Sequence, residues 1–475
     1  MTTANKPRRV LNVFILAMMN VSIMLSLRSL PLISELGLSS LFFFLLVAIT
    51  FLIPCAFVSA ELATGWPKSG GVYVWVREAL GDRWGFFSIW MQWIHNVSWY
   101  PVILSFVATT LAYVIAPELK ENKLYVLAII LVSFWGMTGL NFFGIKVSSW
   151  FSSIGVIAGT ILPGLFIISL GISWFALGNP LQITFSPSAF IPDFHGIGSL
   201  VFMGGLFLAF GGLEVSASLA NEVSNPQKNY PKAILLAALI TFFLLILGAL
   251  SIAIIIPASD LNLVGGLMDA FQHFLSYFHL EWLIPTLGLL LVLGAIAEVN
   301  AWMISPVKGL HAAAAHGNLP PLLQRINKHG TPTNLLILQA IIVSFSSCVF
   351  LFMPSISSSF WILTALSAQS YLIMYIFMFI SAIRLRYTKP HVPRVFKIPF
   401  PHKGIWSLSL MGMFASLFAI LMVFIPPAQI DVGSTAFYVS FLLIGLLIMS
   451  GIPLIFYQMR KPHWVIKQTD NKEYK

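Results

Sequence analysis

Charged side chains are scarce in this sequence, since Asp, Glu, Lys and Arg together make up 9% of its 475 residues. In an ordinary soluble domain about a quarter of the residues are charged. A water-soluble fold of this size is therefore excluded, because its surface would carry too few charged side chains. Hydrophobic residues instead make up 58% of the sequence. A helix needs about 20 apolar residues to cross the hydrocarbon core of a bilayer, and runs of that length recur along the chain. The sequence therefore predicts an all-α membrane protein.

Cysteine is equally scarce, and common catalytic motifs are missing. Cys55 and Cys348 both lie in apolar segments, so they indicate neither a disulfide framework nor a metal site. The sequence has no Walker loop, no zinc-ligand cluster and no catalytic-triad spacing. We therefore expect no enzyme activity, no catalytic residue, no cofactor and no bound metal.

Hydrophobic runs broken by charge, Gly and Pro predict twelve spanning helices. Their approximate ranges are 10–33, 38–62, 85–115, 123–143, 149–176, 197–222, 232–257, 282–310, 332–354, 358–386, 404–426 and 434–457. No soluble domain is long enough to stand apart, so we interpret residues 1–475 as a single transmembrane domain. Its first ten helices divide into repeats of five at about 10–176 and 197–386, and two further helices follow at about 404–457.

Lys and Arg are distributed unevenly between the loops of this topology. If the N-terminus is cytoplasmic, all but three of the 26 Lys and Arg residues fall in cytoplasmic segments. Lys120 and Lys123 lie on the opposite side, and Arg28 lies inside the first helix. The positive-inside rule therefore predicts that both termini are cytoplasmic. The net charge of +10 is spread over short loops rather than gathered in one patch, so nucleic acid is not an expected partner.

Charges inside predicted helices are the most informative positions, because charge in a bilayer is costly and usually functional. They are Arg28 in helix 1, Glu214 in helix 6 and Glu298 in helix 8. For Glu214 the structural alternative is a buried ion pair with Arg28. For Arg28 the alternatives are a structural pair or a side chain that reaches lipid headgroups. Trp302 follows Glu298 by one helical turn, so acid and aromatic are expected to line one cavity.

The sequence of helix 6 predicts an interruption. Phe210, Gly211 and Gly212 precede Glu214, and two helix-destabilising glycines before an acid predict a break that frees backbone groups for a ligand. Close helix packing is the alternative explanation for the glycines.

Helix 1 carries a comparable signal. Ser22, Ser26 and Ser29 precede Pro31, which removes an intrahelical hydrogen bond. Helices 1 and 6 would begin the two halves of a five-plus-five inverted repeat, in which paired discontinuous helices form a site near the midplane.

Two further helices carry polar or aromatic residues at turn spacing. Tyr371 and Tyr375 share a face of helix 10, where they either line a pocket or pack against neighbours. His95 and Asn96 in helix 3 are interpreted as packing residues, with a proton relay as the alternative.

Several runs form a recognisable pattern. They are AELA at 60–63, WPKSGGVYVW at 66–75, GGLE at 211–214, NEVSNP at 221–226, YP at 230–231 and AEVNAWMISPVKG at 297–309. The first two resemble the helix 2 to 3 signature of the amino acid–polyamine–organocation superfamily, and the next three resemble its second signature. The whole pattern, which covers nearly the full chain, is most similar to the bacterial glutamate/γ-aminobutyrate antiporters.

The resemblance implies a carrier that works by alternating access, with a site formed by helices 1, 3, 6, 8 and 10. It also implies the roles of the residues singled out above. Candidate substrate-binding residues are Ser22, Ser26, Arg28, Phe210, Gly211, Gly212, Trp302, Tyr371 and Tyr375. Candidate proton-sensing or gating residues are Glu214 and Glu298.

Two features depart from these antiporters. Arg28-Ser29-Leu30 stands where they have a tyrosine-rich segment, so the contact from helix 1 to substrate is expected to differ. Residues 458–475 alone follow helix 12, in place of a long C-terminal plug associated with pH control, so acid gating is not expected.

We therefore expect a secondary amino acid antiporter, such as a glutamate/γ-aminobutyrate exchanger, in the cytoplasmic (inner) membrane of a bacterium. Its partners would be an amino acid, a counter-substrate or proton, and the lipid bilayer, and a homodimer is compatible with the sequence. Arg28 in the cavity would favour an acidic side chain, which makes glutamate the first substrate to test. The alternatives are a proton-coupled carrier of neutral amino acids or polyamines and, more distantly, a non-transporting sensor or assembly subunit.

Overall fold

The computed structural model describes residues 12–68, 70–192, 201, 203–217, 223–400, 402–427 and 430–465. The elements formed by these residues are all helices, in agreement with the predicted class. Eleven helices among them are long and apolar enough to cross a membrane, and each coincides with a predicted span. The remaining predicted span, near 197–222, is interrupted and lies partly outside the described residues, as do Asn221 and Glu222 at the start of the NEVSNP run.

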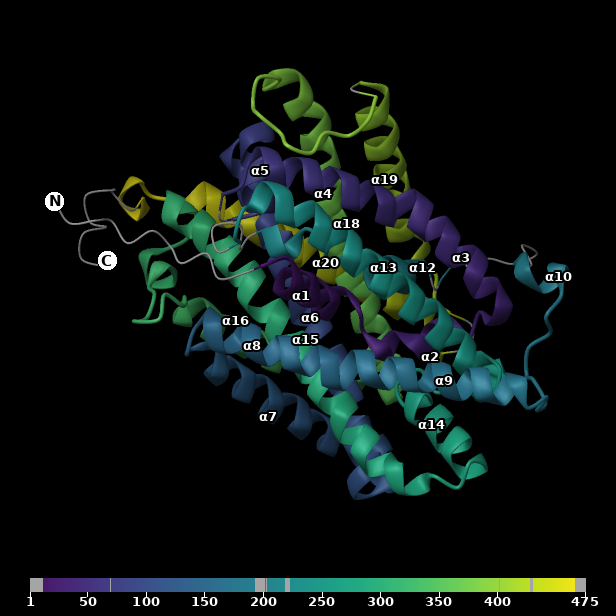
Figure 1. Cartoon of the computed structure of the whole chain (residues 1–475). Helices are drawn as coiled ribbons and strands as arrows, with labels where there is room; N and C mark the ends of the chain where they lie inside the picture. Colours follow the sequence, from purple (N-terminus) through teal and green to yellow (C-terminus); the bar gives the residue numbers. More distant parts are fainter. Residues whose placement is uncertain are drawn as a thin grey trace.

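The helices follow one another with short connections (Figure 1). Their bounds are α1 (Val13–Met24), α2 (Leu30–Ser34), α3 (Ser40–Val47), α4 (Ile53–Gly65), α5 (Val72–Leu80), α6 (Asp82–Ile115), α7 (Lys123–Asn141), α8 (Ile145–Val156), α9 (Leu162–Ala176), α10 (Pro187–Phe190), α12 (Met203–Ala209), α13 (Pro226–Ala253), α14 (Gly266–Tyr277), α15 (Ile284–Ala313), α16 (Thr333–Ser347), α17 (Val349–Phe352), α18 (Ile356–Thr388), α19 (Lys403–Met422) and α20 (Thr435–Met459).

Two spans contain a π-helical turn directly before a proline. Ala48–Leu52 joins α3 to α4, in which Pro54 occupies the first turn, and Ile157–Ile161 joins α8 to α9 in the same way before Pro163. Proline has no N–H to donate, so the hydrogen-bond ladder widens by one residue ahead of it. These prolines bend their spans without ending them.

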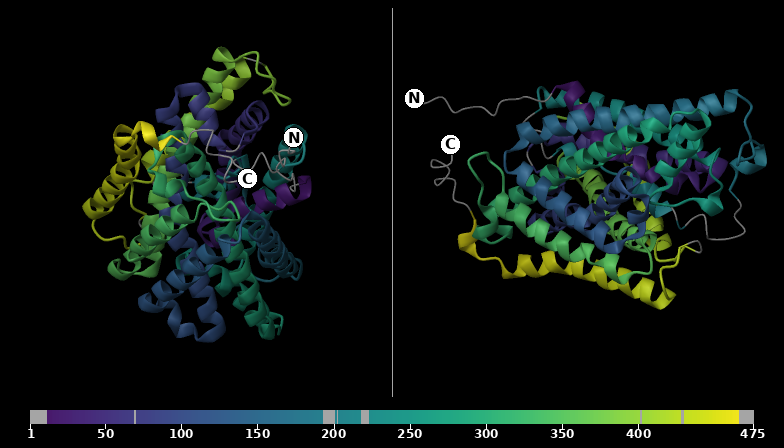
Figure 2. Two further views of the ribbon diagram at one scale, coloured as in Figure 1. Left: turned by 90° about the vertical axis from the view of Figure 1, so that its left-hand side faces the viewer. Right: turned by 90° about the horizontal axis from the view of Figure 1, so that it is seen from below.

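The long helices α6 and α15 pack along each other at the centre, and α18 packs along α6 (Figure 1). α1 lies against α13, α8 and α15. Helices at the edge, such as α20 in Figure 2, expose apolar side chains, including Leu447 at 69% and Ile448 at 55% exposure. An outward face of this kind fits a lipid solvent, and the chain is a multi-pass membrane protein.

Helix 1 is interrupted, but not for the reason that its sequence suggested. α1 ends at Met24, and Leu25 and Ser26 adopt extended backbone before a 3₁₀ turn over Leu27–Ser29 and the short helix α2. Pro31 lies in the first turn of α2, where a missing N–H costs no hydrogen bond. The break therefore precedes Pro31 by about a turn and places Ser26 and Arg28 in non-α-helical backbone.

Two amphipathic helices were missed by the hydropathy analysis because neither spans the membrane. α5 lies between the second and third spans, and α14 lies between the seventh and eighth. Residues 82–84, expected in a loop, form the first turn of α6. These local differences leave the order of the spanning helices unchanged.

Candidate functional site

Glu214 lies immediately after the break that follows α12, and its buried carboxylate is surrounded by donors. The hydroxyls of Tyr371 and Tyr375 donate to its two oxygens, each at 2.5 Å. Nε2 of Gln92 donates to Oε1 at 2.8 Å. These partners come from α18 and α6, so one acid joins three segments of the bundle. Within the part of the chain that the structure describes, the side chains that donate to Glu214 are neutral, and no Lys or Arg forms an ion pair with it.

The two glycines before Glu214 are required by close contacts. A Cβ on Gly211 would lie 2.7 Å from a ring carbon of Tyr371. Gly212 adopts a φ of +113°, and a Cβ there would lie 2.6 Å from Ile23. Side chains of L-residues rarely adopt this backbone conformation. The glycines thus lie at the helix break and also pack closely against their neighbours. The two explanations given from the sequence, a break and close packing, are therefore compatible.

Side chains satisfy several backbone groups that the breaks release. Nε1 of Trp302 donates to the carbonyl of Ile23 at 2.9 Å, near the end of α1. The hydroxyl of Tyr375 accepts from the N–H of Gly212 at 2.8 Å. The hydroxyl of Ser305 donates to the carbonyl of Val215 at 2.6 Å. An unpaired backbone group in a membrane interior is costly, so these contacts stabilise both interruptions.

An aromatic wall lines the space between the two breaks. The rings of His95 and Tyr371 stack with centroids 4.1 Å apart and an interplanar angle of 7°. Trp302 meets His95 edge-on at 5.2 Å and Tyr371 at 5.7 Å. Trp99 continues the wall, with its ring 5.5 Å from that of Trp302. His95 was interpreted as a packing residue, and the structure places it beside the candidate tyrosine.

Arg28 and Glu298 line one small cavity, of about 10 Å³, together with Ser26. That volume holds about one water molecule. Arg28 is 6% exposed, and its guanidinium lies over the rings of Trp99 and Phe360 at 5.5 and 5.7 Å. Its Nε has no hydrogen-bond partner among the described residues. A buried guanidinium with an unused donor is a group able to bind an anion.

Arg28 does not pair with Glu214, contrary to the structural alternative considered for these two residues. The carboxylate of Glu214 takes its hydrogen bonds from neutral side chains, and Arg28 faces Glu298 across the cavity. Arg28 and Glu214 lie near the breaks of the two helices that begin the expected repeats. Similar positions along two repeats do not imply contact, because the helices run past different neighbours.

The structure brings most of the candidate residues to the two breaks. Ser22 is buried, and no residue that the structure describes forms a hydrogen bond with its hydroxyl. Phe210 is fully buried and meets Phe44 edge-on at 5.1 Å, so its ring packs against α3. Gln92 and Trp99 were missed as site residues, although Gln92, His95 and Trp99 recur at one-turn intervals along α6. Gln92 is a polar residue in an apolar helix, which is a signal that could have indicated its role.

Comparison with known proteins identifies the family of the chain. A family model described as amino acid permease matches residues 11–448. An uncharacterized transporter of Legionella pneumophila is 44% identical over 95% of this chain and 97% of its own length. A glutamate/gamma-aminobutyrate antiporter of Lactococcus lactis is 32% identical over 93% of this chain and 89% of its own. A polyamine transporter of Oryza sativa is 25% identical over 79% of this chain and 65% of its own.

These matches confirm the resemblance found in the sequence motifs, and the relatives named are transporters rather than enzymes. The match spans the two interrupted helices, the aromatic wall and Glu214 alike. The chain belongs to the amino acid permease family.

Proposed function

We propose that this protein exchanges an acidic amino acid, glutamate first among them, for a related counter-substrate such as γ-aminobutyrate. The observation that carries the proposal is Arg28, a buried guanidinium with an unused Nε donor at the break in helix 1. A guanidinium matches the planar geometry of a carboxylate. The glutamate/gamma-aminobutyrate antiporter of Lactococcus lactis supports the same substrate class.

The two breaks offer complementary groups for the common part of an amino acid. Carbonyls at the end of α1 carry partial negative charge and suit an ammonium group. N–H groups that begin the segment after Ser26 suit the carboxylate. The carboxyl of the side chain would then reach Arg28. Exchange follows if the site opens alternately to either side of the membrane.

Glu214 is proposed as the proton-sensing or gating acid. It links the segment after the helix 6 break to α6 and α18 through Gln92, Tyr371 and Tyr375. Because these donors are neutral, protonation of Glu214 would weaken its hydrogen bonds and would leave no cation without a counter-charge. Glu298 is proposed to balance Arg28 when the substrate carboxylate is absent.

Counterflow in proteoliposomes tests the function directly. Vesicles preloaded with unlabelled glutamate should accumulate labelled glutamate and labelled γ-aminobutyrate, and vesicles without internal substrate should accumulate neither. The panel should include neutral amino acids and putrescine, which test the alternative carriers. Failure of every amino acid, under several pH gradients and counter-substrates, would reject amino acid transport.

Arg28→Leu tests the residue that selects the substrate. A charge-assisted hydrogen bond contributes about 1.5 to 3 kcal/mol, so the variant should bind glutamate more weakly by about tenfold or more. The affinity for neutral amino acids should fall less. The affinity of Arg28→Lys for glutamate should lie between those of Arg28→Leu and the wild type. Equal losses for acidic and neutral substrates would show that Arg28 is structural.

A further inference from the structure

The connection between α18 and α19 has an unusual composition. Cationic and aromatic residues alternate along its flanks, mostly three positions apart: Arg384, Tyr387, Lys397, Phe400, Lys403 and Trp406. Between Glu298 and Asp431 the sequence has no acidic residue to offset these charges. The connection is therefore strongly basic and also rich in large rings.

Four of the aromatic and apolar residues in this connection and its flanks face outward. Phe400 is 78% exposed, Val395 58%, Tyr387 51% and Trp406 42%. Nε1 of Trp406 donates to the hydroxyl of Tyr387 at 2.9 Å, so the two flanks are joined at the surface. Figures 1 and 2 show the connection projecting from the edge of the bundle, in light green near the top of Figure 1.

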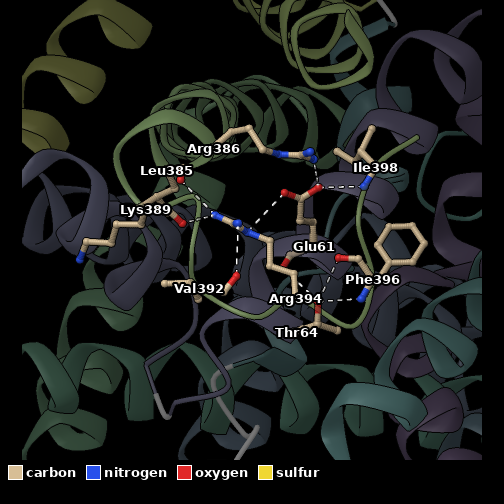
Figure 3. Close-up of polar contacts among 9 residues, drawn as sticks. All are labelled: Glu61, Thr64, Leu385, Arg386, Lys389, Val392, Arg394, Phe396 and Ile398. Carbon is tan, nitrogen blue, oxygen red and sulfur yellow. Dashed lines mark hydrogen bonds and ion pairs between the residues drawn. The ribbon is translucent and has the colours of Figure 1, made fainter. Parts of the chain in front are cut away.

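The opposite face of the connection is fixed to the protein by a buried acid (Figure 3). Glu61, at 3% exposure near the end of α4, accepts from Arg386 and from the N–H of Ile398 at 2.8 Å. Nε of Arg394 lies 3.5 Å from Oε1 of the same carboxylate. Thr64 adds contacts to the backbone of Phe396. The outward face is thus presented by an ordered segment.

This face continues into a helix surface that suits lipid. α19 begins at Lys403, and farther along it Phe414 is 68% exposed and Leu421 54%. Apolar side chains of this kind on a spanning helix lie against acyl chains. The cations and rings are therefore at the depth where such a helix leaves the hydrocarbon and meets the headgroups.

We propose that residues 384–400 and 402–406 form a docking surface for the anionic phospholipid headgroups of the cytoplasmic leaflet. Basic residues beside a spanning helix are attracted to anionic lipid, and aromatic rings lie at the headgroup level. The charge of the surface and its continuity with α19 favour lipid over a soluble protein partner. Headgroup binding holds the connection against α4, because Arg394 and the surface cations belong to the same short segment.

Thermal unfolding of the purified full-length protein in micelles tests this surface without any transport substrate. Adding phosphatidylglycerol should raise the unfolding temperature, and adding phosphatidylcholine should raise it much less. Lys397→Gln with Lys403→Gln should at least halve the rise, because two of the three exposed cations are removed. Phe400→Ser should reduce the rise through loss of interfacial contact.

A matched control distinguishes this surface from general attraction to the basic side of the protein. Arg325→Gln with Lys328→Gln removes two exposed cations from another loop and should leave the lipid effect intact. An equal reduction in both double variants would overturn the proposal. So would an equal rise with inorganic phosphate, which carries the headgroup charge without a membrane surface. Because amino acid exchange is not measured, these outcomes are independent of the proposed substrate.

Discussion

Two buried carboxylates of this protein have different kinds of partner. Glu61 and Glu214 are 3% and 1% exposed, and each joins helices that are far apart in sequence. Glu61 is held by the guanidinium groups of Arg386 and Arg394. Glu214 is held by hydroxyl and amide groups. Buried acids of similar exposure therefore have opposite kinds of partner.

The difference teaches which contact is permanent and which can be exchanged. Guanidinium groups stay charged at any ordinary pH, so the ion pairs of Glu61 with Arg386 and Arg394 hold this acid in place. Hydroxyl and amide partners can reorganise, and they leave no charge behind when the acid takes a proton or a substrate arrives. We therefore interpret Glu61 as a structural residue and Glu214 as a residue that changes its partners during transport.

The largest expected effect is the loss of stability when the charge of Glu61 is removed. Glu61→Gln leaves Arg386 and Arg394 buried without a counter-charge, and removing one partner of a buried ion pair costs about 3 to 5 kcal/mol. The free energy of unfolding in detergent should fall by an amount in this range. Glu78→Gln is the matched control, since Glu78 pairs with Lys389 of the same connection at a more exposed position. It should cost less than about 1 kcal/mol.

A loss of similar size in both variants would show that burial does not distinguish the two ion pairs. The comparison between Glu61 and Glu214 would then lose its physical basis.

The next effect concerns the tyrosines that hold Glu214. Tyr375→Phe removes a donor to the carboxylate and the acceptor for the N–H of Gly212. Tyr371→Phe removes a single donor. Leaving a buried polar group unpaired costs about 1 to 3 kcal/mol, so the first variant should be destabilised more than the second. Equal unfolding free energies for the two variants would argue against anchoring of the helix 6 break by Tyr375.

A smaller effect on stability is expected for Glu214→Gln. The amide keeps the shape and most of the hydrogen bonds, and it replaces charged by neutral bonding at a cost of about 1 kcal/mol. The exchange rate, in contrast, should lose its dependence on pH if this acid takes up a proton. Rates measured between about pH 5 and pH 8 check this, with Glu298→Gln for comparison. An unchanged pH profile would reject the proton-sensing role of Glu214.

The spanning helices were predictable because a bilayer imposes a single strong rule, a minimum run of apolar residues. Eleven predicted spans recur in the described residues with small shifts at their ends. α5 and α14 were missed because short amphipathic helices give no such run. The break in helix 1 was placed too late, since Pro31 is a visible signal and the extended backbone at Leu25 is set by its neighbours.

The site was predictable where the residue type itself is exceptional. Glycine before an acid in an apolar helix pointed to Gly212 and Glu214, and the structure places both at the break. Partner choice was not predictable, because it depends on how helices cross. Gln92 and Trp99 became apparent only through their contacts with Glu214 and Trp302. A sequence shows which groups are costly to bury, and the fold decides what surrounds them.

The smallest expected effect extends the comparison to acids outside the spanning segments. Burial raises the pKa of Glu35 to about 7, whereas the hydrogen bond from Lys389 lowers the pKa of Glu78. Glu35 binds its proton more tightly in the folded protein, so it destabilises the fold as pH rises past its unfolded pKa of about 4.5 and on towards 7. Glu35→Gln should therefore match the wild type near pH 4 and become the more stable protein near pH 8, by less than about 1 kcal/mol after solvent screening. Glu78→Gln should show the opposite sign, with its deficit shrinking as pH falls. Unfolding temperatures of both variants across this range measure the two slopes, and parallel curves would show that a cation partner does not decide how these carboxylates titrate.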